Sequence, residues 1–139
     1  MAGPEAFGTR PYAANRAVSA EVVTVLRGTT DNRGLKLEAY RSRAVVGGHV
    51  HELMVTDQPN AEPNSIVDSV GLIAFVSIVS SGVLLVGSEV MLGERRLGEV
   101  VGFDDTHMPN HQNICVRVDE MTDGVQFGVD LESEVRFVT

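Results

Sequence analysis

Four histidines fall in two short segments of the chain, and acidic residues lie beside both segments. His49 and His51 belong to "HVHEL", and His107 and His111 belong to "FDDTHMPNHQNI". Imidazole nitrogens bind first-row metal ions such as Zn²⁺ and Fe²⁺, and they also transfer protons near neutral pH. The two segments therefore predict one histidine site, which either binds a divalent metal ion or acts by acid–base catalysis.

Carboxylates in the same segments fit both a metal site and a site for acid–base catalysis. Glu52 belongs to the first segment, and Asp104 and Asp105 stand near the start of the second. A carboxylate can ligate a metal ion, orient an imidazole ring or serve as a general base. The residues expected to be catalytic are His107, His111, Asp105 and Glu52. Those expected to ligate a metal ion are His51, His107, His111 and His49.

The second segment is expected to be a loop. Pro109 lies between His107 and His111, and proline disrupts the interior of a helix. The two rings therefore have no spacing that a helix would set. The segment also has a purely structural interpretation, because turn-forming side chains bond to their own backbone; these residues are Asp104, Thr106 and Asn110.

The first segment is expected to lie on a strand, where alternate residues share a face. His49 and His51 would then project together on the face of Leu53, with Glu52 on the opposite face. His49 follows a glycine pair, so it also fits an exposed residue at the start of the strand.

Other reactive side chains have weaker contexts. Cys115 is the only cysteine, and its alternating strand pattern lacks the setting that a reactive thiolate requires. The sequence contains no nucleophile motif around its serines and no phosphate-binding loop. Arg41 and Arg43 share one strand face, where they either meet an anionic ligand or form a solvated edge.

Most of the chain is predicted to form short strands separated by turns. Valine-rich and alternating stretches favour strands, and clusters of Gly, Asn, Asp and Pro favour turns. A short helix is expected to start near residue 66, capped by Asn64 or Ser65. The pattern predicts an all-β fold, a small antiparallel β-barrel of about eight short strands with at most one or two short helices. The expected strands are 19–27, 35–46, 49–57, 72–80, two flanking a hairpin turn at 93–96, 113–120 and a last one at the C-terminal end.

The length of 139 residues fits one domain. We expect a flexible N-terminal tail over residues 1–17 and a single β-barrel domain over residues 18–139. The tail has no apolar stretch of the kind found in secretory signals. The longest apolar run, "VGLIAFVSIVSSGVLLVG", is interrupted by serines and glycines and is rich in β-branched residues. It therefore predicts strands rather than a membrane-spanning helix.

Charge and cysteine content narrow the classes of partner and compartment. The formal net charge is −8, and it is spread unevenly. Residues 1–43 carry seven basic and four acidic side chains, whereas residues 44–139 carry four basic and fifteen acidic ones. Such an acidic body lacks the basic surface that nucleic acids and anionic membranes require. A single cysteine excludes an internal disulfide and suits the reducing cytoplasm.

From about residue 53 to the end, the order of elements resembles the glucitol/sorbitol-specific IIA component of the bacterial phosphotransferase system. This resemblance implies a small β-barrel. It does not imply phosphotransfer, because the family's phosphoacceptor histidine lies in a segment that here reads "FVSIV", residues 75–79. The segments that carry the resemblance are "ELMVTDQPNAEPNS", "LIAFVSIV", "VGSEVMLGERRLGEVVGFDD", "NICVRVD" and "SEVRFV".

The whole chain, through "NRGLKL", "HELMVTD" and "FDDTHMPNHQNI", also resembles a family of small uncharacterised bacterial proteins. That resemblance implies the barrel fold again and supplies no chemistry.

These features together predict a small cytoplasmic β-barrel enzyme with both histidine segments at one mouth of the barrel. Its substrate would be a small organic molecule, and its reaction that of a lyase, isomerase or cyclase of specialised metabolism. Zn²⁺ or Fe²⁺ would be the cofactor if the histidines ligate a metal ion. Small barrels commonly bind one small ligand at a mouth. The alternative is a non-catalytic barrel that binds a small molecule or a protein, as a homodimer through exposed strand edges.

Overall fold

The computed structural model describes residues 11–139, and these residues form twelve strands and one short helix. The first six strands are β1 Val18–Val25, β2 Thr29–Thr30, β3 Leu35–Lys36, β4 Ser42–Val45, β5 Val50–Thr56 and β6 Ile66–Val67. The remaining elements are β7 Val70–Ile78, β8 Gly82–Leu85, β9 Glu89–Leu92, β10 Arg95–Asp104, β11 Gln112–Arg117, α1 Gly124–Phe127 and β12 Glu134–Val138.

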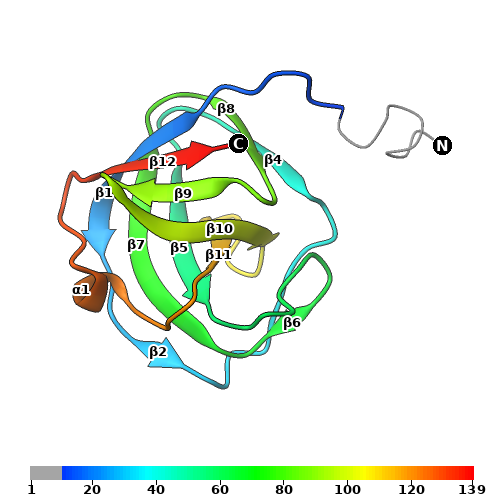
Figure 1. Ribbon diagram of the computed structural model, residues 1–139, viewed down its shortest axis with the longest axis vertical. Helices are drawn as coiled ribbons and strands as arrows, with labels where there is room; N and C mark the ends of the chain where they lie inside the picture. The colour runs from blue at the N-terminus through cyan, green and yellow to red at the C-terminus, as the bar shows by residue number, and fades with distance from the viewer. Residues whose placement is uncertain (1–10) are drawn as a thin grey trace.

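Seven of the strands close into a barrel (Figure 1). Their order is β1–β12–β9–β10–β11–β5–β7, and β7 pairs with β1 to complete the ring. The pairs in the ring are antiparallel except for β11 with β5, which run parallel. The predicted all-β barrel is therefore confirmed, and the purely antiparallel arrangement is corrected at one pair.

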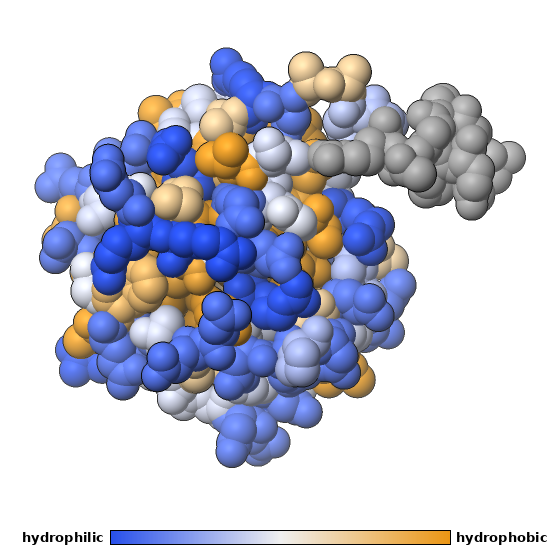
Figure 2. Space-filling model, viewed as in Figure 1, coloured by the Kyte–Doolittle hydropathy of each residue, from blue (hydrophilic) through white to orange (hydrophobic). Residues whose placement is uncertain are grey.

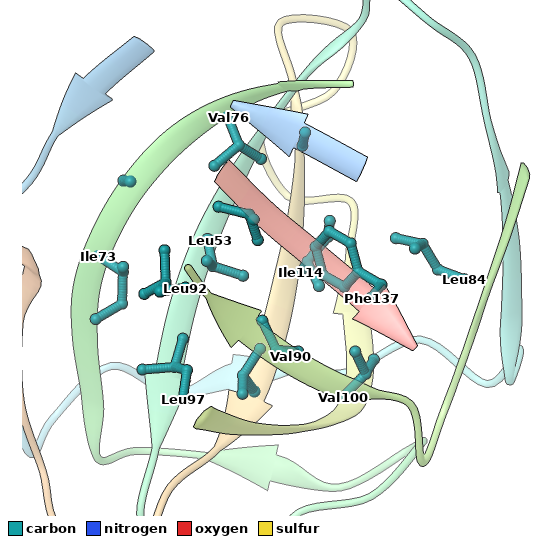
Figure 3. Close-up of a cluster of buried hydrophobic side chains, with 14 of the residues drawn as sticks. Leu53, Ile73, Val76, Leu84, Val90, Leu92, Leu97, Val100, Ile114 and Phe137 are labelled. Carbon is teal, nitrogen blue, oxygen red and sulfur yellow. The ribbon is translucent and has the colours of Figure 1, made fainter. Parts of the chain in front are cut away.

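Aliphatic side chains fill the interior of the barrel (Figure 3). Because alternate residues of a strand share a face, β5 contributes Leu53 and Val55 to this core, and β11 contributes Ile114 and Val116. Phe103 of β10 is fully buried beside them. The interior is thus a packed hydrophobic core, and any polar site lies at its ends or on its outer surface.

A second, smaller core covers the outside of the barrel over β5 and β11. Met54 and Cys115 project outward there and pack against Leu35, Leu37 and Val67. These three residues lie in or beside the ribbon that β3 forms with β6. The ribbon covers the middle of the outer face of β5, a strand that is buried on both faces from its second residue to its last.

Two local predictions are wrong. Residues 66 and 67 form strand β6 rather than the start of a helix. Asn64 has a φ of 72°, whereas an N-cap residue has an extended backbone, and the Ser65 hydroxyl bonds back to Glu62. The stretch 35–46, expected as one strand, is divided into β3 and β4.

The predicted tail lies partly outside the described residues, which begin at residue 11. Residues 11–17 have no regular secondary structure. Three of their side chains nevertheless bond to residues in or beside the β4–β8 pair: Tyr12 donates to the Ser42 hydroxyl, Asn15 to the carbonyl of Val83 and Arg16 to that of Ser81. The one helix found in residues 11–139 has four residues, and none in that range is long and apolar enough to cross a membrane.

Candidate functional site

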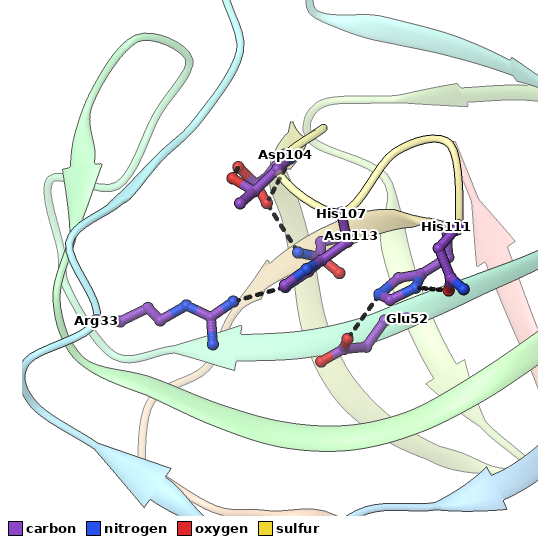
Figure 4. Close-up of polar contacts among 8 residues, drawn as sticks. Arg33, Glu52, Asp104, His107, His111 and Asn113 are labelled. Atoms are coloured by element: carbon purple, nitrogen blue, oxygen red, sulfur yellow. Dashed lines mark hydrogen bonds and ion pairs between the residues drawn. The ribbon is translucent and has the colours of Figure 1, made fainter.

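The loop after β10 folds back over the start of β5, and this brings the two histidine segments together (Figure 4). His111 Nε2 lies 3.0 Å from a carboxylate oxygen of Glu52. Both side chains are largely buried, with 12% and 9% of their surfaces exposed. The contact joins an imidazole and a carboxylate that are 59 residues apart in the chain.

The His111 ring is held from several directions. Its Nδ1 lies 2.6 Å from Asn110 Oδ1. The Phe75 ring meets it in an edge-to-face arrangement at 4.9 Å between centroids, and the His107 ring stacks on it at 5.1 Å. An oxygen acceptor lies beside each ring nitrogen, so either nitrogen can donate a hydrogen bond when it carries the proton. The surroundings therefore fix the orientation of the ring toward Glu52.

Arg33 and His107 extend this arrangement toward solvent. The Arg33 guanidinium lies 3.2 Å from His107 Nε2. A guanidinium can only donate, so Nε2 accepts, and in this arrangement the ring proton sits on Nδ1. His107 is exposed and Arg33 is half-buried. We call these four residues, Arg33, Glu52, His107 and His111, the outer cluster.

Asp104 anchors the loop that carries the two histidines. Its carboxylate accepts from the Asn113 side-chain amide at 2.8 Å and from the Thr106 hydroxyl at 2.6 Å. Asp104 and Asn113 are 1% and 0% exposed. These bonds hold the end of β10 and the start of the loop against β11. Asp104 Oδ2 also accepts from the backbone N–H of Thr106 at 3.3 Å, which is the kind of local bond that the structural interpretation expects.

His51 lies on the opposite face of β5 from Glu52, on the face of Leu53 and the barrel interior. It is 5% exposed, and its Nδ1 has no hydrogen-bond partner among the described residues. Burial, followed by the positive charges of Arg43, His49 and His111, lowers the pKa of His51 to about 4. The ring is therefore neutral near neutral pH.

Asp105 joins His51 on the inner side rather than the outer cluster. Tyr40 Oη donates to Asp105 Oδ2 at 2.8 Å, and Gln112 Nε2 donates to Asp105 Oδ1 at 2.9 Å and to Tyr40 Oη at 2.7 Å. Gln112 pairs with His51 across the parallel strands. Burial and then the Asp105 carboxylate raise the pKa of Tyr40, so the phenol keeps its proton. We call this group, Tyr40, Arg43, His51, Asp105 and Gln112, the inner rim.

The predicted site residues thus form two groups on opposite faces of β5. The outer cluster takes three of them, namely Glu52, His107 and His111. The inner rim takes His51 and Asp105. His49 is exposed and belongs to neither group. Within residues 11–139, no group of three or more His, Cys, Asp or Glu side chains is arranged to hold a metal ion.

Four polar residues of these two groups are missing from the sequence-based site, namely Arg33, Tyr40, Arg43 and Gln112. Arg33 stands in a turn of the type "DNRG", and Tyr40 stands at the end of an alternating stretch. Neither position carries a motif. Gln112 directly follows His111 in the sequence, and this position beside a predicted site residue is the one sequence signal that could have identified it.

Two open grooves lie elsewhere on the barrel. Hydrophilic side chains cover most of the face shown in Figure 2, and apolar ones gather only in small separate patches. One groove of about 420 Å³ lies between the loop after β5 and strand β10, and its charged lining residues are Arg41, Glu62, Glu99 and Arg117. The other, of about 450 Å³, lies beside α1, and its charged lining residues are Arg95, Arg96, Asp119 and Glu120. Neither groove borders the outer cluster or the inner rim.

Comparison with known proteins identifies a family and no activity. No curated protein matches the chain, and no solved structure matches it. The expected resemblance to the glucitol/sorbitol-specific IIA component finds no support in these comparisons. A model of the family of unknown function DUF6917 matches residues 12–138. The chain belongs to this family of unknown function, DUF6917.

Proposed function

We propose that this protein is an enzyme that transfers protons on a small organic substrate, with the Glu52–His111 pair as its acid–base group. The observation that carries the proposal is the buried Glu52 carboxylate 3.0 Å from His111 Nε2. Many lyases, isomerases and cyclases need such a group, because they add or remove a proton next to the bond that changes.

The pair can act as other carboxylate–histidine pairs do. A carboxylate that accepts the Nε2 proton fixes the tautomer of the ring, leaves Nδ1 as the reacting nitrogen and stabilises the imidazolium that forms. Asn110 Oδ1 lies 2.6 Å from that nitrogen, and because an amide oxygen only accepts, it has to turn away before Nδ1 takes up a substrate proton. Asn110 is exposed, so its side chain can turn into solvent when a substrate approaches.

Arg33 and His107 would bind the substrate beside the pair. The Arg33 guanidinium uses one of its five N–H groups on His107. The other N–H groups are available for an anionic substrate group. His107 stacks on the reacting ring and would cover one side of the substrate. An anionic carbon acid is therefore the substrate class that fits the outer cluster.

Proton exchange at carbon tests the proposal without knowledge of the full reaction. A panel of 2-oxo acids and 3-oxo acids is incubated with the protein in D₂O, and loss of the C–H signal is followed by proton NMR. We expect wild type to accelerate exchange of at least one acid, and His111→Gln to lower that rate by about 10² to 10⁴. His49→Gln is the matched control and should keep the wild-type rate. Exchange that is absent throughout the panel, or equal in His111→Gln, would count against the proposal.

A bound Zn²⁺ or Fe²⁺ is a second form of the same proposal. The ion would have to replace the proton between His111 and Glu52 and displace Arg33 from His107. Metal analysis of protein prepared without a polyhistidine tag separates the two forms. Metal-assisted chemistry would be favoured if wild type contains stoichiometric metal and His107→Ala and His111→Ala do not. If wild type is free of metal, proton transfer by the Glu52–His111 pair alone is the form that remains.

A non-catalytic binding barrel is the second candidate function. It is favoured by the two open grooves, of about 420 and 450 Å³, which lie away from the outer cluster. This candidate includes a homodimer formed through strand edges, which sedimentation equilibrium would test. For both candidates we keep the cytoplasm as the proposed compartment, because a single cysteine suits a reducing environment.

A further inference from the structure

The inner rim holds three buried polar atoms that have no hydrogen-bond partner among the described residues. They are Arg43 Nε, His51 Nδ1 and Gln112 Oε1. His51 and Gln112 are paired residues of neighbouring strands, and the charge of Arg43 acts on both His51 and Tyr40. The three atoms therefore belong to one place in the fold.

Such a group is unusual, because buried polar atoms in folded proteins nearly always have a partner. One further unpartnered atom, Asn113 Oδ1, lies on the other face of the strand pair and is unrelated to these three. His51 and Gln112 are 5% and 1% exposed. Three unpartnered atoms at one end of the barrel point to a partner that the chain itself does not supply.

The orientation of the Gln112 amide is set by its neighbours. Its Nε2 lies within hydrogen-bond distance of both the Asp105 carboxylate and Tyr40 Oη. The carboxylate can only accept, so the nitrogen must face it, and Oε1 must point the other way. Gln112 therefore presents an acceptor that needs a donor such as a hydroxyl group.

Arg43 adds a positive charge without a counter-ion. Among residues 11–139, no carboxylate lies within ion-pair distance of its guanidinium. The Asp105 carboxylate of the inner rim accepts from Tyr40 and Gln112 instead. A bridging water molecule could satisfy His51 and Gln112, but water cannot neutralise Arg43. An anion can.

We propose that the inner rim binds a small 2-hydroxy carboxylate, whose carboxylate pairs with Arg43 and His51 and whose hydroxyl donates to Gln112 Oε1. Neutral His51 donates from Nδ1 or accepts there, according to its tautomer, and in this complex it donates. Tyr40 and Arg43 are half-buried, so the site lies at the rim, and a ligand would reach it from the side of these two residues. This site is on the opposite face of β5 from Glu52, and it does not depend on catalysis by the Glu52–His111 pair.

Matched pairs of ligands and variants test the proposal. Glycolate carries both groups, and acetate lacks only the hydroxyl. We expect glycolate to bind wild type about tenfold more tightly than acetate, which corresponds to one good hydrogen bond. Arg43→Gln should weaken glycolate binding by at least about tenfold, the effect of losing a charged hydrogen-bond partner. Arg41→Gln is the control, because Arg41 is exposed and lines a separate groove.

The wild-type protein also supplies a readout that requires no variant. Glycolate should shift the ¹⁵N resonance of His51 Nδ1 and leave that of His49 in place. The proposal is overturned if glycolate does not bind saturably up to about 100 mM, if acetate binds as tightly as glycolate, or if Arg43→Gln and Arg41→Gln bind alike. If Arg43→Gln does not fold, the comparison of glycolate with acetate and the shift of the His51 resonance in the wild-type protein still test the proposal.

Discussion

Replacement of His51 should make the protein less sensitive to acid. The pKa of His51 is about 4 in the folded protein, mainly because the ring is buried, against an ordinary value of 6.5. As the pH falls below 6.5, the unfolded chain therefore takes up a proton on this residue before the folded protein does. The contribution of neutral His51 to the free energy of unfolding is fully present above about pH 6.5, and it is lost as the pH falls toward 4.

The size of the effect follows from the shift in the pKa of His51. Each unit of pKa difference corresponds to about 1.4 kcal/mol. At pH 5 the wild type should have lost about 2 kcal/mol of its free energy of unfolding through this residue, and about 3 kcal/mol at pH 4. The residue is 5% exposed, so solvent weakens the effect little.

Urea unfolding at several pH values between about 4.5 and 7.5 measures this loss. His51→Asn, which keeps a small polar side chain, should lose less stability over that range than wild type, by about 2 kcal/mol at pH 5. His49→Asn is the matched control and should follow wild type, since His49 is exposed. Titrating carboxylates contribute equally to all three proteins and cancel in the comparison. The reasoning would be refuted if the free energies of unfolding of His51→Asn and wild type changed in parallel with pH. An NMR titration that places the His51 pKa near 6.5 would refute it as well.

Three further predictions concern packing and reactivity. His111→Leu should lower the free energy of unfolding by about 1–3 kcal/mol, because it leaves the buried Glu52 carboxylate without a partner. His107 is exposed, so His107→Leu should lower the free energy of unfolding clearly less. Equal losses in the two variants would show that the Glu52–His111 contact does not stabilise the fold. Gly98→Ala should cost about 1–3 kcal/mol or more in urea unfolding, since an added Cβ would lie 1.9 Å from a backbone carbonyl of β11; an unchanged midpoint would contradict this close approach. Burial raises the pKa of the Cys115 thiol to about 12, so an aromatic disulfide reagent should label it in urea and not in the folded protein.

Local alternation accounts for what the sequence predicts well. Ile114 and Val116 are predicted on one face of their strand and Cys115 on the other, and the structure has the first two in the barrel core and Cys115 in the outer core. The hairpin between β9 and β10 also falls at its predicted turn. Both features depend only on neighbouring residues, since side-chain direction alternates along a strand and glycine favours tight turns.

Contacts between distant residues account for what the sequence does not predict. Arg33 meets His107 across 74 residues, and Tyr40 meets Asp105 across 65 residues. Each contact depends on which strands pair when the barrel closes, and no residue type in a single sequence specifies that choice. The same limit applies to the predicted single site, because it assumes that His51 faces the loop that carries His107.

The parallel pairing of β11 with β5 explains why both polar groups lie at one end of the barrel. In this register Gln112 pairs with His51 and Asn113 pairs with Glu52. The polar residues near the start of each strand therefore lie side by side, and the apolar residues that follow them pack together. An antiparallel pairing over the same residues would place Gln112 beside Thr56, at the end of β5 opposite the histidines. The loop of residues 105–111 would then lie far from Glu52, and neither group could form. Strand direction, rather than the spacing of the histidines, therefore creates the candidate site.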